Sequence, residues 1–168
     1  MKTNLFVDEF NGRIEESFYV SSFEGAMYYG DSIEEIIKKI LEDNKTEPPT
    51  EGAIDIPSEE FELKVRNTIN NDTVDKIELV FQQPDYKTVT FILQQVITST
   101  MGGDDEQKVN FDLVEYTRLK LYFTLKEWNI EKNGVKAPVD SDTLLSLHPD
   151  VVQGIVAKMN KHIKDYRV

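Results

Sequence analysis

The residues best suited to acid–base or metal chemistry in this 168-residue chain are its two histidines, His148 and His162. A histidine titrates near neutral pH and is the commonest metal ligand among protein side chains. His148 precedes Pro149 at a predicted helix start, and His162 lies in a lysine-rich helix end, where the helix dipole favours cations. Because other candidate ligands are rare near either histidine in the sequence, both are predicted to have structural roles.

A run of acidic residues, Asp104-Asp105-Glu106, is the next candidate for chemistry, as a divalent-cation site. A calcium-binding loop needs acids at alternating positions and a closing bidentate glutamate, and that spacing is absent. The run is therefore predicted to be a solvated loop. The other acidic residues are numerous enough to supply a pair of catalytic carboxylates, but no pair stands in an apolar setting.

The sequence contains no cysteine, which removes thiol catalysis, disulfides and cysteine-based zinc sites. It also lacks a G-x-S-x-G motif, a glycine-rich phosphate loop and an H-E-x-x-H motif. We therefore predict a non-enzymatic protein with no catalytic residue, no cofactor and no bound metal. An enzyme, or a domain that accompanies one, stays as an alternative that would need a concave site with convergent carboxylates.

The formal net charge of −12 is unevenly distributed along the chain. Residues 1–60 hold 15 acidic and 5 basic residues, whereas residues 61–168 hold 16 and 14. Because such a chain repels phosphate backbones, we expect no direct contact with nucleic acid. The acidic first third could meet a basic protein surface, or its charge could serve solubility alone.

No apolar run reaches the roughly 18–20 residues that span a bilayer. The apolar stretch at the start of the sequence is too short for a signal peptide and is interrupted by acids. We therefore expect no membrane partner, and a location in the cytoplasm or in a particle that is assembled there.

Aromatic residues are the side chains best suited to a protein interface. The candidate interface residues are Phe6, Phe10, Phe18, Tyr19, Phe23, Tyr28, Tyr29 and Trp128. Asn11-Gly12 lies between two apolar runs and predicts a β-hairpin, because both residues accept the positive φ of a type I′ turn. Residues 1–30 are then either a hairpin that closes over a core, which we favour, or an arm that wraps a partner.

The elements that position these aromatic residues begin with a helix over 32–44, which has a serine-led capping box and a stripe of isoleucines. Residues 45–60, rich in proline and glutamate, are predicted to form a linker or an exposed loop. Residues 61–66 alternate strictly between apolar and polar side chains, and residues 74–81 place three apolar side chains on one face. These two segments predict a second hairpin.

The second half of the chain is predicted to be mainly helical. Residues 86–100 combine helical spacing with β-branched residues, and their length favours a helix. Residues 109–128 are the longest periodic segment. A helix apolar on most sides is central in the fold or buried in an oligomer, so a homo-oligomer is compatible with the sequence. A turn at Asn133-Gly134, a short helix over 140–147 and a closing helix from Pro149 follow.

Together these elements predict an α+β fold with a mostly helical C-terminal unit and one or two β-hairpins in the N-terminal half. The length fits one domain, or one domain with an appendage. We place the predicted boundary after the proline-rich loop. It separates an acidic, aromatic-rich segment over 1–60 from a hairpin and helical domain over 61–168.

From Leu121 onward a predicted helix ends in Trp128, a polar Asn-Gly turn follows, and a proline, a leucine-rich turn and a closing helix complete the segment. The residues that mark this order are Trp128, Asn133, Gly134, Pro138, Leu144, Leu147 and Pro149. The stretch from Leu121 to Ile163 resembles the C-terminal part of many small proteins of tailed bacteriophages, several of which are classed as tail assembly chaperones. This resemblance covers about a quarter of the chain and carries no catalytic residue.

The resemblance implies a mostly helical, chaperone-like protein that binds other phage structural or assembly proteins in the host cytoplasm during virion assembly. Its partner would be the tape measure protein, or the tail tube that polymerises around it. The acidic, aromatic residues 1–60 are not expected in a minimal chaperone. That departure keeps a second interpretation open, a structural component of the virion such as a capsid decoration, connector, tail or baseplate protein.

Overall fold

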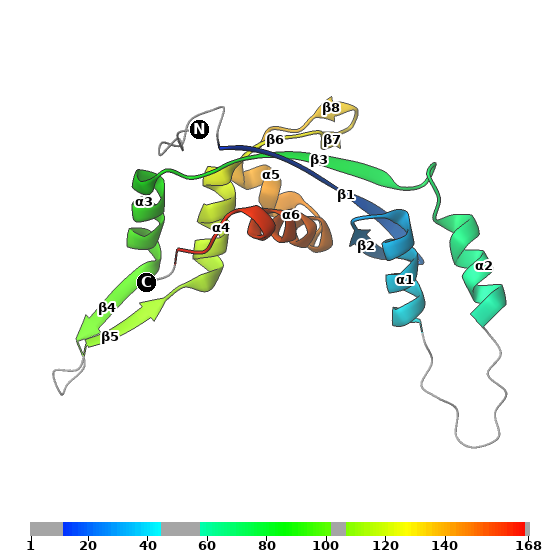
Figure 1. The fold of residues 1–168 in the computed structure, drawn as a ribbon, viewed down its shortest axis with the longest axis horizontal. Coiled ribbons are helices and arrows are strands. Elements are labelled where there is room, and N and C mark those ends of the chain that lie inside the picture. The colour runs from blue at the N-terminus through cyan, green and yellow to red at the C-terminus, as the bar shows by residue number, and fades with distance from the viewer. Residues whose placement is uncertain (1–11, 45–57, 102–106, 167–168) are drawn as a thin grey trace, which may run out of the picture. The chain divides into compact units, whose positions relative to one another are not determined.

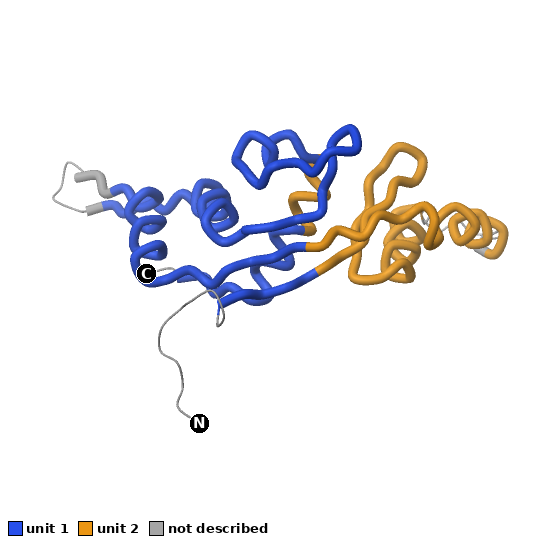
Figure 2. The backbone as a smooth tube through the Cα atoms, turned by 90° about the horizontal axis from the view of Figure 1, so that it is seen from above, with its two compact units in different colours: residues 1–16, 79–147, 155–168 blue, residues 17–78, 148–154 orange. Residues whose placement is uncertain are grey.

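The structure, a computed structural model, describes residues 12–44, 58–101 and 107–166 of the chain. Helices and small antiparallel sheets alternate along it (Figure 1), so the predicted α+β class is confirmed. The chain divides into two compact units, which Figure 2 shows in different colours. Unit 1 comprises residues 1–16, 79–147 and 155–168, and unit 2 comprises residues 17–78 and 148–154. This division does not follow the predicted boundary at residue 60.

Strand β1 (Arg13–Phe23) begins in unit 1 and continues into unit 2, where it forms a hairpin with β2 (Ala26–Gly30). The two strands pair from Tyr19 opposite Gly30 to Phe23 opposite Ala26. Glu24 and Gly25 form its turn with φ values of 48° and 85°. Positive φ at both central residues is the requirement of a type I′ turn, which matches the twist of the two strands. The hairpin predicted around Asn11-Gly12 has its first strand outside the described residues.

Helix α1 (Ile33–Asp43) confirms the predicted helix and its cap. The Ser32 hydroxyl accepts a hydrogen bond from the Glu35 amide at 3.1 Å. The Glu35 carboxylate reaches back to the amide of Asp31 at 2.8 Å, one residue before the position expected in a capping box. Side chains therefore accept hydrogen bonds from two backbone amides at the start of α1, those of Asp31 and Glu35.

The strand predicted over residues 61–66 is wrong, because these residues lie in α2 (Ser58–Thr68). Val65 and Ile69 are buried with three isoleucines of α1, and Phe61 packs against the same cluster. Apolar side chains four residues apart share one face of a helix, so this stripe faces α1. The predicted hairpin of 61–66 with 74–81 is therefore replaced by a helix that leads into β3. Most of the predicted loop, residues 45–57, lies outside the described residues.

Strand β3 (Asp75–Gln82) confirms the predicted strand and belongs to a four-stranded sheet of order β2-β1-β3-β6. Its alternating side chains Ile77, Leu79 and Phe81 are buried. Strand β6 (Leu125–Trp128) pairs antiparallel with β3, with a register shift between Val80 and Phe81.

Unit 1 is built around α3 (Tyr86–Val96), β4 (Ile97–Met101), β5 (Gln107–Phe111) and α4 (Leu113–Thr124). The two strands pair antiparallel from Ile97 opposite Phe111, so a hairpin joins two helices. The helix predicted over 86–100 is therefore correct only as far as Val96. The single helix predicted over 109–128 is wrong, because the segment forms β5, α4 and β6.

The last part of the chain has the turn and the two helices that the sequence predicts. Asn133 and Gly134, with φ values of 56° and 76°, turn the chain between β7 (Glu131–Lys132) and β8 (Val135–Lys136). Asp140 caps α5 (Ser141–Ser146), and Pro149 is the first residue of α6 (Pro149–His162). Among the described residues, no helix combines the length and the apolar character needed to cross a membrane.

Candidate protein-binding groove

Helix α3 positions a group of accessible apolar side chains around a hollow. Pro84 lies just after β3, and the Asp85 carboxylate accepts a hydrogen bond from the Thr88 amide at 2.8 Å, which caps the helix. Hydrogen bonds from Thr88 lower the pKa of Asp85, so this cap is ionised at neutral pH. The cap fixes where α3 begins and therefore which of its side chains face outward.

The apolar side chains of α3 face two different surfaces, the core that the helix shares with α4 and a hollow on the outside. Ile92 and Val96 are buried against Tyr116 and Leu119 of α4. Along the neighbouring line, Val89, Leu93 and Ile97 are only half-buried. Val89 and Leu93 are four residues apart and share one face of the helix, and Ile97, the first residue of β4, directly follows the helix. This second line is the floor of a hollow on the protein surface.

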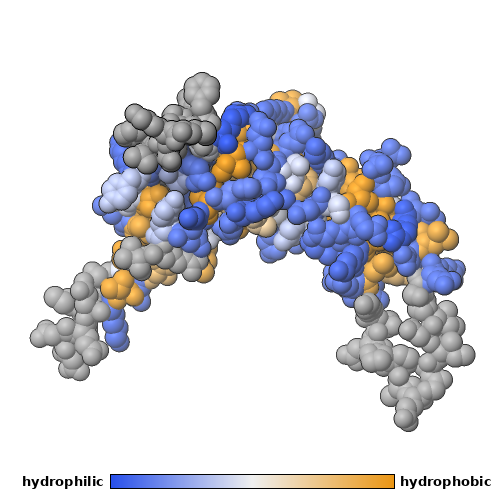
Figure 3. All heavy atoms as spheres, in the orientation of Figure 1, coloured by the Kyte–Doolittle hydropathy of each residue, from blue (hydrophilic) through white to orange (hydrophobic). Residues whose placement is uncertain are grey.

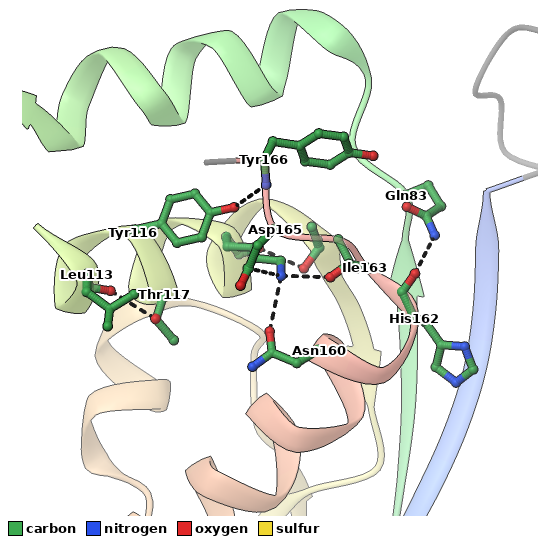
Figure 4. Close-up of polar contacts among 11 residues, drawn as sticks. Gln83, Leu113, Tyr116, Thr117, Asn160, His162, Ile163, Asp165 and Tyr166 are labelled. Carbon is green, nitrogen blue, oxygen red and sulfur yellow. Dashed lines mark hydrogen bonds and ion pairs between the residues drawn. The ribbon is translucent and has the colours of Figure 1, made fainter. Parts of the chain in front are cut away.

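The other wall of the hollow is the segment that follows α6, and Lys120 holds this segment in place. The ammonium group of Lys120 donates hydrogen bonds to the Ile163 carbonyl at 2.7 Å, to Asp165 Oδ1 at 2.9 Å and to Asn160 Oδ1 at 3.1 Å (Figure 4). The Lys120 side chain is only 4% exposed. Three acceptors therefore compensate for the loss of water around this charge.

Two further hydrogen bonds fix the ends of the same segment. Gln83 Nε2 donates to the His162 carbonyl at 3.0 Å, and the Tyr166 amide donates to the Tyr116 hydroxyl at 3.0 Å. Figure 4 shows the Tyr166 ring beside α3, on the side away from the Lys120 contacts. The C-terminal segment is thus tied to β3 and α4 by its backbone, which leaves the Tyr166 ring as a wall of the hollow.

The result is an open groove of about 810 Å³, which we call the α3 groove. Its lining residues are Pro84, Tyr86, Val89, Thr90, Leu93, Gln94, Ile97 and Tyr166. They come from the start of α3, one face of that helix and the C-terminal segment. Tyr86 is 86% exposed and Tyr166 is 41% exposed, so two aromatic rings stand at the rim.

The chemistry of the α3 groove is that of apolar recognition. Its described lining offers aliphatic carbons, two phenols, one hydroxyl and one amide, and it holds no carboxylate, imidazole or amine. Phenols add hydrogen-bonding groups to large apolar rings, which is why tyrosine is common at protein interfaces. In the part of the chain that the structure covers, no group of three acidic or histidine side chains could hold a metal ion.

Most of the aromatic residues that the sequence proposed for an interface lie elsewhere. Phe18, Phe23 and Trp128 are 1%, 4% and 2% exposed, so their side chains pack inside the chain. The Trp128 indole donates a hydrogen bond to the Ala137 carbonyl at 2.7 Å. Tyr19 is half-buried against the α1–α2 core. Phe6 and Phe10 lie outside the described residues.

Tyr28 and Tyr29 are the candidates that the structure brings together at a surface. With Lys39, Asp43 and Asp150, they line a second depression of about 280 Å³ in unit 2, together with Ala26 and Met27. The Lys39 ammonium lies 4.3 Å from the Tyr29 ring centroid and donates to the Tyr29 carbonyl at 2.6 Å. Burial, and then the charge of Asp43, raise the pKa of the Tyr28 phenol. This depression is smaller and more charged than the α3 groove.

Neither histidine is among the residues that line the two hollows. His148 Nδ1 accepts a hydrogen bond from the Asp150 amide at 3.3 Å. His162 contacts the Glu16 carboxylate, which also pairs with Lys158 at 3.4 Å and Lys161 at 3.1 Å. These contacts join β1 to α6 within unit 1. Asp104-Asp105-Glu106 lies outside the described residues.

Sequence reasoning missed the α3 groove, although one signal for it was present. Figure 3 shows a mainly hydrophilic face on which hydrophobic residues form separate patches. Tyr86 directly precedes the apolar periodicity of α3, whereas Tyr166 lies far from it in the sequence. Neither is among the interface candidates that the sequence suggests. Comparison of the chain with protein-family models, with curated proteins and with solved structures found no match.

Proposed function

We propose that the protein is a non-enzymatic binding protein that holds an apolar segment of another protein in the α3 groove. The observation that carries this proposal is the open, apolar groove of about 810 Å³ with two exposed tyrosine rings at its rim. Concave apolar sites of this size are where proteins take up small ligands or peptide side chains. A helix face with apolar residues four apart suits a helical or extended peptide as the occupant.

The class of partner that we propose is a tail assembly protein of a bacteriophage, either the tape measure protein or the tail tube protein. The resemblance of Leu121–Ile163 to phage tail assembly chaperones supports this class. The structure contains the Asn133-Gly134 turn of that pattern and the helices that begin after Asp140 and at Pro149. It departs from the pattern at Trp128, which ends a strand and not a helix.

The proposal is tested by co-expressing the full chain with the tape measure protein, and separately with the tail tube protein, encoded in the same genome. We expect one of the two to copurify with the chain and to stay soluble longer than it does alone. If neither protein binds the chain when the two are co-expressed, the proposed partner class is wrong.

The composition of purified virus particles then separates a chaperone from a structural component. A transient chaperone that acts in the host cytoplasm is absent from particles, and mass spectrometry of particles should therefore not detect the chain. Stoichiometric amounts of the chain in particles would contradict the chaperone role and would assign the protein to the virion.

A further inference from the structure

We infer that two copies of this chain associate through strand β4, which pairs with its own counterpart in antiparallel orientation across a twofold axis at Ser99. This association involves only the β4–β5 hairpin of unit 1. It goes beyond the proposed function and does not depend on it.

The β4–β5 hairpin is a two-stranded sheet with two open edges. The strands pair from Ile97 opposite Phe111 to Met101 opposite Gln107, and among the described residues no third strand joins them. The hairpin extends away from α3 and α4 (Figure 1). A sheet of two strands is marginally stable by itself in water, and each edge presents unpaired N–H and C=O groups. A further strand at one edge would bind these groups.

The hydrogen-bond pattern of the hairpin determines which backbone groups of β4 face outward. The Asp112 amide donates a hydrogen bond to the Val96 carbonyl at 3.0 Å, and these two residues continue the ladder of the hairpin by one pair. Opposed residues in an antiparallel pair alternate between hydrogen-bonded and non-hydrogen-bonded positions, so every second residue of β4 directs its backbone groups away from β5. These residues are Ile97, Ser99 and Met101.

Antiparallel pairing centred on Ser99 would use most of these outward groups. The Ser99 amide of each copy would donate to the Ser99 carbonyl of the other, and the Met101 amide would donate to the Ile97 carbonyl. The Ile97 amide is not needed, because it already donates to the Leu93 carbonyl at the end of α3. The twofold axis repeats each bond, so the contact has hydrogen bonds at its centre and at both ends.

The residue types along β4 are symmetric about Ser99. A threonine and then an apolar residue follow on each side of it, in the order Ile-Thr-Ser-Thr-Met. In the proposed register, Thr98 is opposite Thr100 of the second copy. Ile97 is likewise opposite Met101 of the second copy. Threonines at directly opposed positions favour antiparallel pairing. The strand is therefore complementary to itself in this one register.

The two edges of the hairpin differ in charge. Strand β4 contains no charged residue, whereas β5 contains Lys108. Lysine on an edge strand is one of the features by which proteins discourage pairing with another chain. The edge of β4 has no such protection, so β4 is the strand that we expect to pair.

The contact is small, so the association should be weak and reversible. Specific, stable interfaces bury about 1,200–2,000 Å², which is more than two five-residue strands bury alone. We therefore expect dimers at high protein concentration and monomers after dilution. A disulfide bond across the axis would capture even a transient dimer.

The dimer would bring two α3 grooves to one axis. Ile97 lines the α3 groove and is also the first residue of β4, two positions before Ser99. A partner that presents two apolar segments could then bind both grooves at once and with higher overall affinity. This consequence rests on the proposed function, whereas the dimer itself does not.

The first test is disulfide trapping, which is simple because the chain has no cysteine. Directly opposed residues have Cα atoms about 4.5–5.5 Å apart, which a disulfide can bridge. Val109→Cys is the matched control for Ser99→Cys, because Val109 lies opposite Ser99 on β5. In the proposed dimer both β4 strands separate the two Val109 positions, so they are more than about 7 Å apart and cannot be bridged.

In a glutathione redox buffer, we expect Ser99→Cys to give at least about tenfold more covalent dimer than Val109→Cys on a non-reducing gel. A mixture of Thr98→Cys and Thr100→Cys should also give covalent dimer. Each of these two variants alone should give little, because like positions are then diagonal neighbours about 7–8 Å apart. Equal yields from Ser99→Cys and Val109→Cys would overturn the inference. Equal yields from the mixture and from Thr98→Cys alone would overturn it too.

The second test needs no thiol. Proline lacks the amide hydrogen and is tolerated at a strand edge where the N–H faces solvent. Ser99→Pro would therefore remove the central hydrogen bonds of the dimer and keep those between β4 and β5. Val109→Pro is its control, because the Val109 amide faces outward from the other edge of the hairpin. Circular dichroism would check that both variants stay folded.

Sedimentation equilibrium over a dilution series measures the dimer of each chain. We expect Ser99→Pro to raise the dissociation constant of the dimer at least about tenfold, and Val109→Pro to leave it within about twofold. A chain that stays monomeric at every concentration would overturn the inference, as would a Ser99→Pro chain that dimerises normally. Assemblies larger than a dimer would also overturn it, because a twofold contact closes on itself.

Both tests contain only this chain, so their outcome is independent of the proposed function. If the chain does not dimerise, the α3 groove of a monomer can still bind a phage protein. If the chain dimerises but binds no phage protein, the proposed function fails and the β4 contact stands.

Discussion

Lys120 is a positive charge whose side chain lies almost entirely inside the protein. Its ammonium group makes hydrogen bonds to Asn160, Asp165 and the carbonyl of Ile163, so each of its three protons has an acceptor. One of those acceptors is a backbone carbonyl of the segment that forms a wall of the α3 groove. The Lys120 side chain therefore joins α4 to the segment that forms this wall of the groove.

Replacing Lys120 by methionine keeps most of the side-chain volume but removes the three donors. We expect Lys120→Met to lower the free energy of unfolding by about 1–3 kcal/mol, because the Ile163 carbonyl loses its side-chain partner in a buried place. Urea denaturation measures this change, and Lys126→Met, at an exposed position of β6, is the control. Equal stability of the two variants would show that the Lys120 contacts do not hold the C-terminal segment.

Helices α1 and α2 are joined at their surface by Arg66. Its guanidinium binds both carboxylate oxygens of Glu34 at 2.8 Å and Glu62 Oε1 at 2.9 Å. Paired hydrogen bonds of this kind are more directional than a single ion pair. The hydrogen bonds from Arg66 lower the pKa of Glu34 below its ordinary value. The contribution of this pair to stability therefore depends on pH.

A carboxylate with a lowered pKa in the folded state stabilises the fold above its unfolded pKa, which is about 4.3 for glutamate. This contribution is lost as the pH falls through the folded pKa. We therefore expect the stability difference between the unsubstituted chain and Arg66→Gln to be constant above about pH 5 and to shrink below about pH 4. Denaturation at several pH values measures it, and Lys132→Gln, at an exposed position of β7, controls for the lost charge. A stability difference that does not change with pH would show that Arg66 does not lower the pKa of Glu34.

Helix α6 contains a glycine that a helix would ordinarily disfavour. Alanine in a helix interior is usually about 1 kcal/mol better than glycine. At Gly154, however, an added methyl group would overlap the ring of Phe18, which is only 1% exposed and has little room to move. We expect Gly154→Ala to destabilise the protein by about 1–3 kcal/mol, the cost of overpacking a core.

Thermal denaturation of Gly154→Ala beside Gln153→Ala, an exposed position of the same helix, measures this effect. Combining Gly154→Ala with Phe18→Leu should recover part of the loss, because the smaller side chain makes room for the methyl group. An increase in stability for Gly154→Ala alone would mean that the ring moves aside at little cost.

Elements with their own caps and periodicity are predictable from the sequence. Ser32, Asp140 and Pro149 mark helix starts by chemistry that is local to the chain, and the structure has helices at all three. The strand predicted over 61–66 is wrong because alternation also fits a helix here. Phe61 and Val65 lie one helical turn apart, and Leu63, which a strand would have buried with them, is 60% exposed.

The candidate site is not predictable, because its walls are distant in the sequence. The sequence identifies the apolar stripe over 86–97 as a whole, but it does not say which half faces α4. That division depends on Tyr116 and Leu119 on one side and on Tyr166 on the other. Tyr166 lines the groove only because Lys120, some forty residues earlier, holds the backbone beside it.

At the scale of the whole molecule, we propose that the α3 groove binds another polypeptide. Tyr86 and Val114 are 86% and 82% exposed, but only Tyr86 lines the groove. A charge placed at either position should therefore leave the fold intact. A charge in the groove opposes an apolar occupant, because it must lose water when the occupant binds.

Titration calorimetry compares Tyr86→Asp with Val114→Asp in their binding to the tail assembly protein that we propose as the partner. We predict that Tyr86→Asp weakens binding at least about tenfold, equivalent to about 1.4 kcal/mol, whereas Val114→Asp leaves the affinity within about twofold of the unsubstituted chain. Unchanged binding by Tyr86→Asp would show that the α3 groove does not bind the partner.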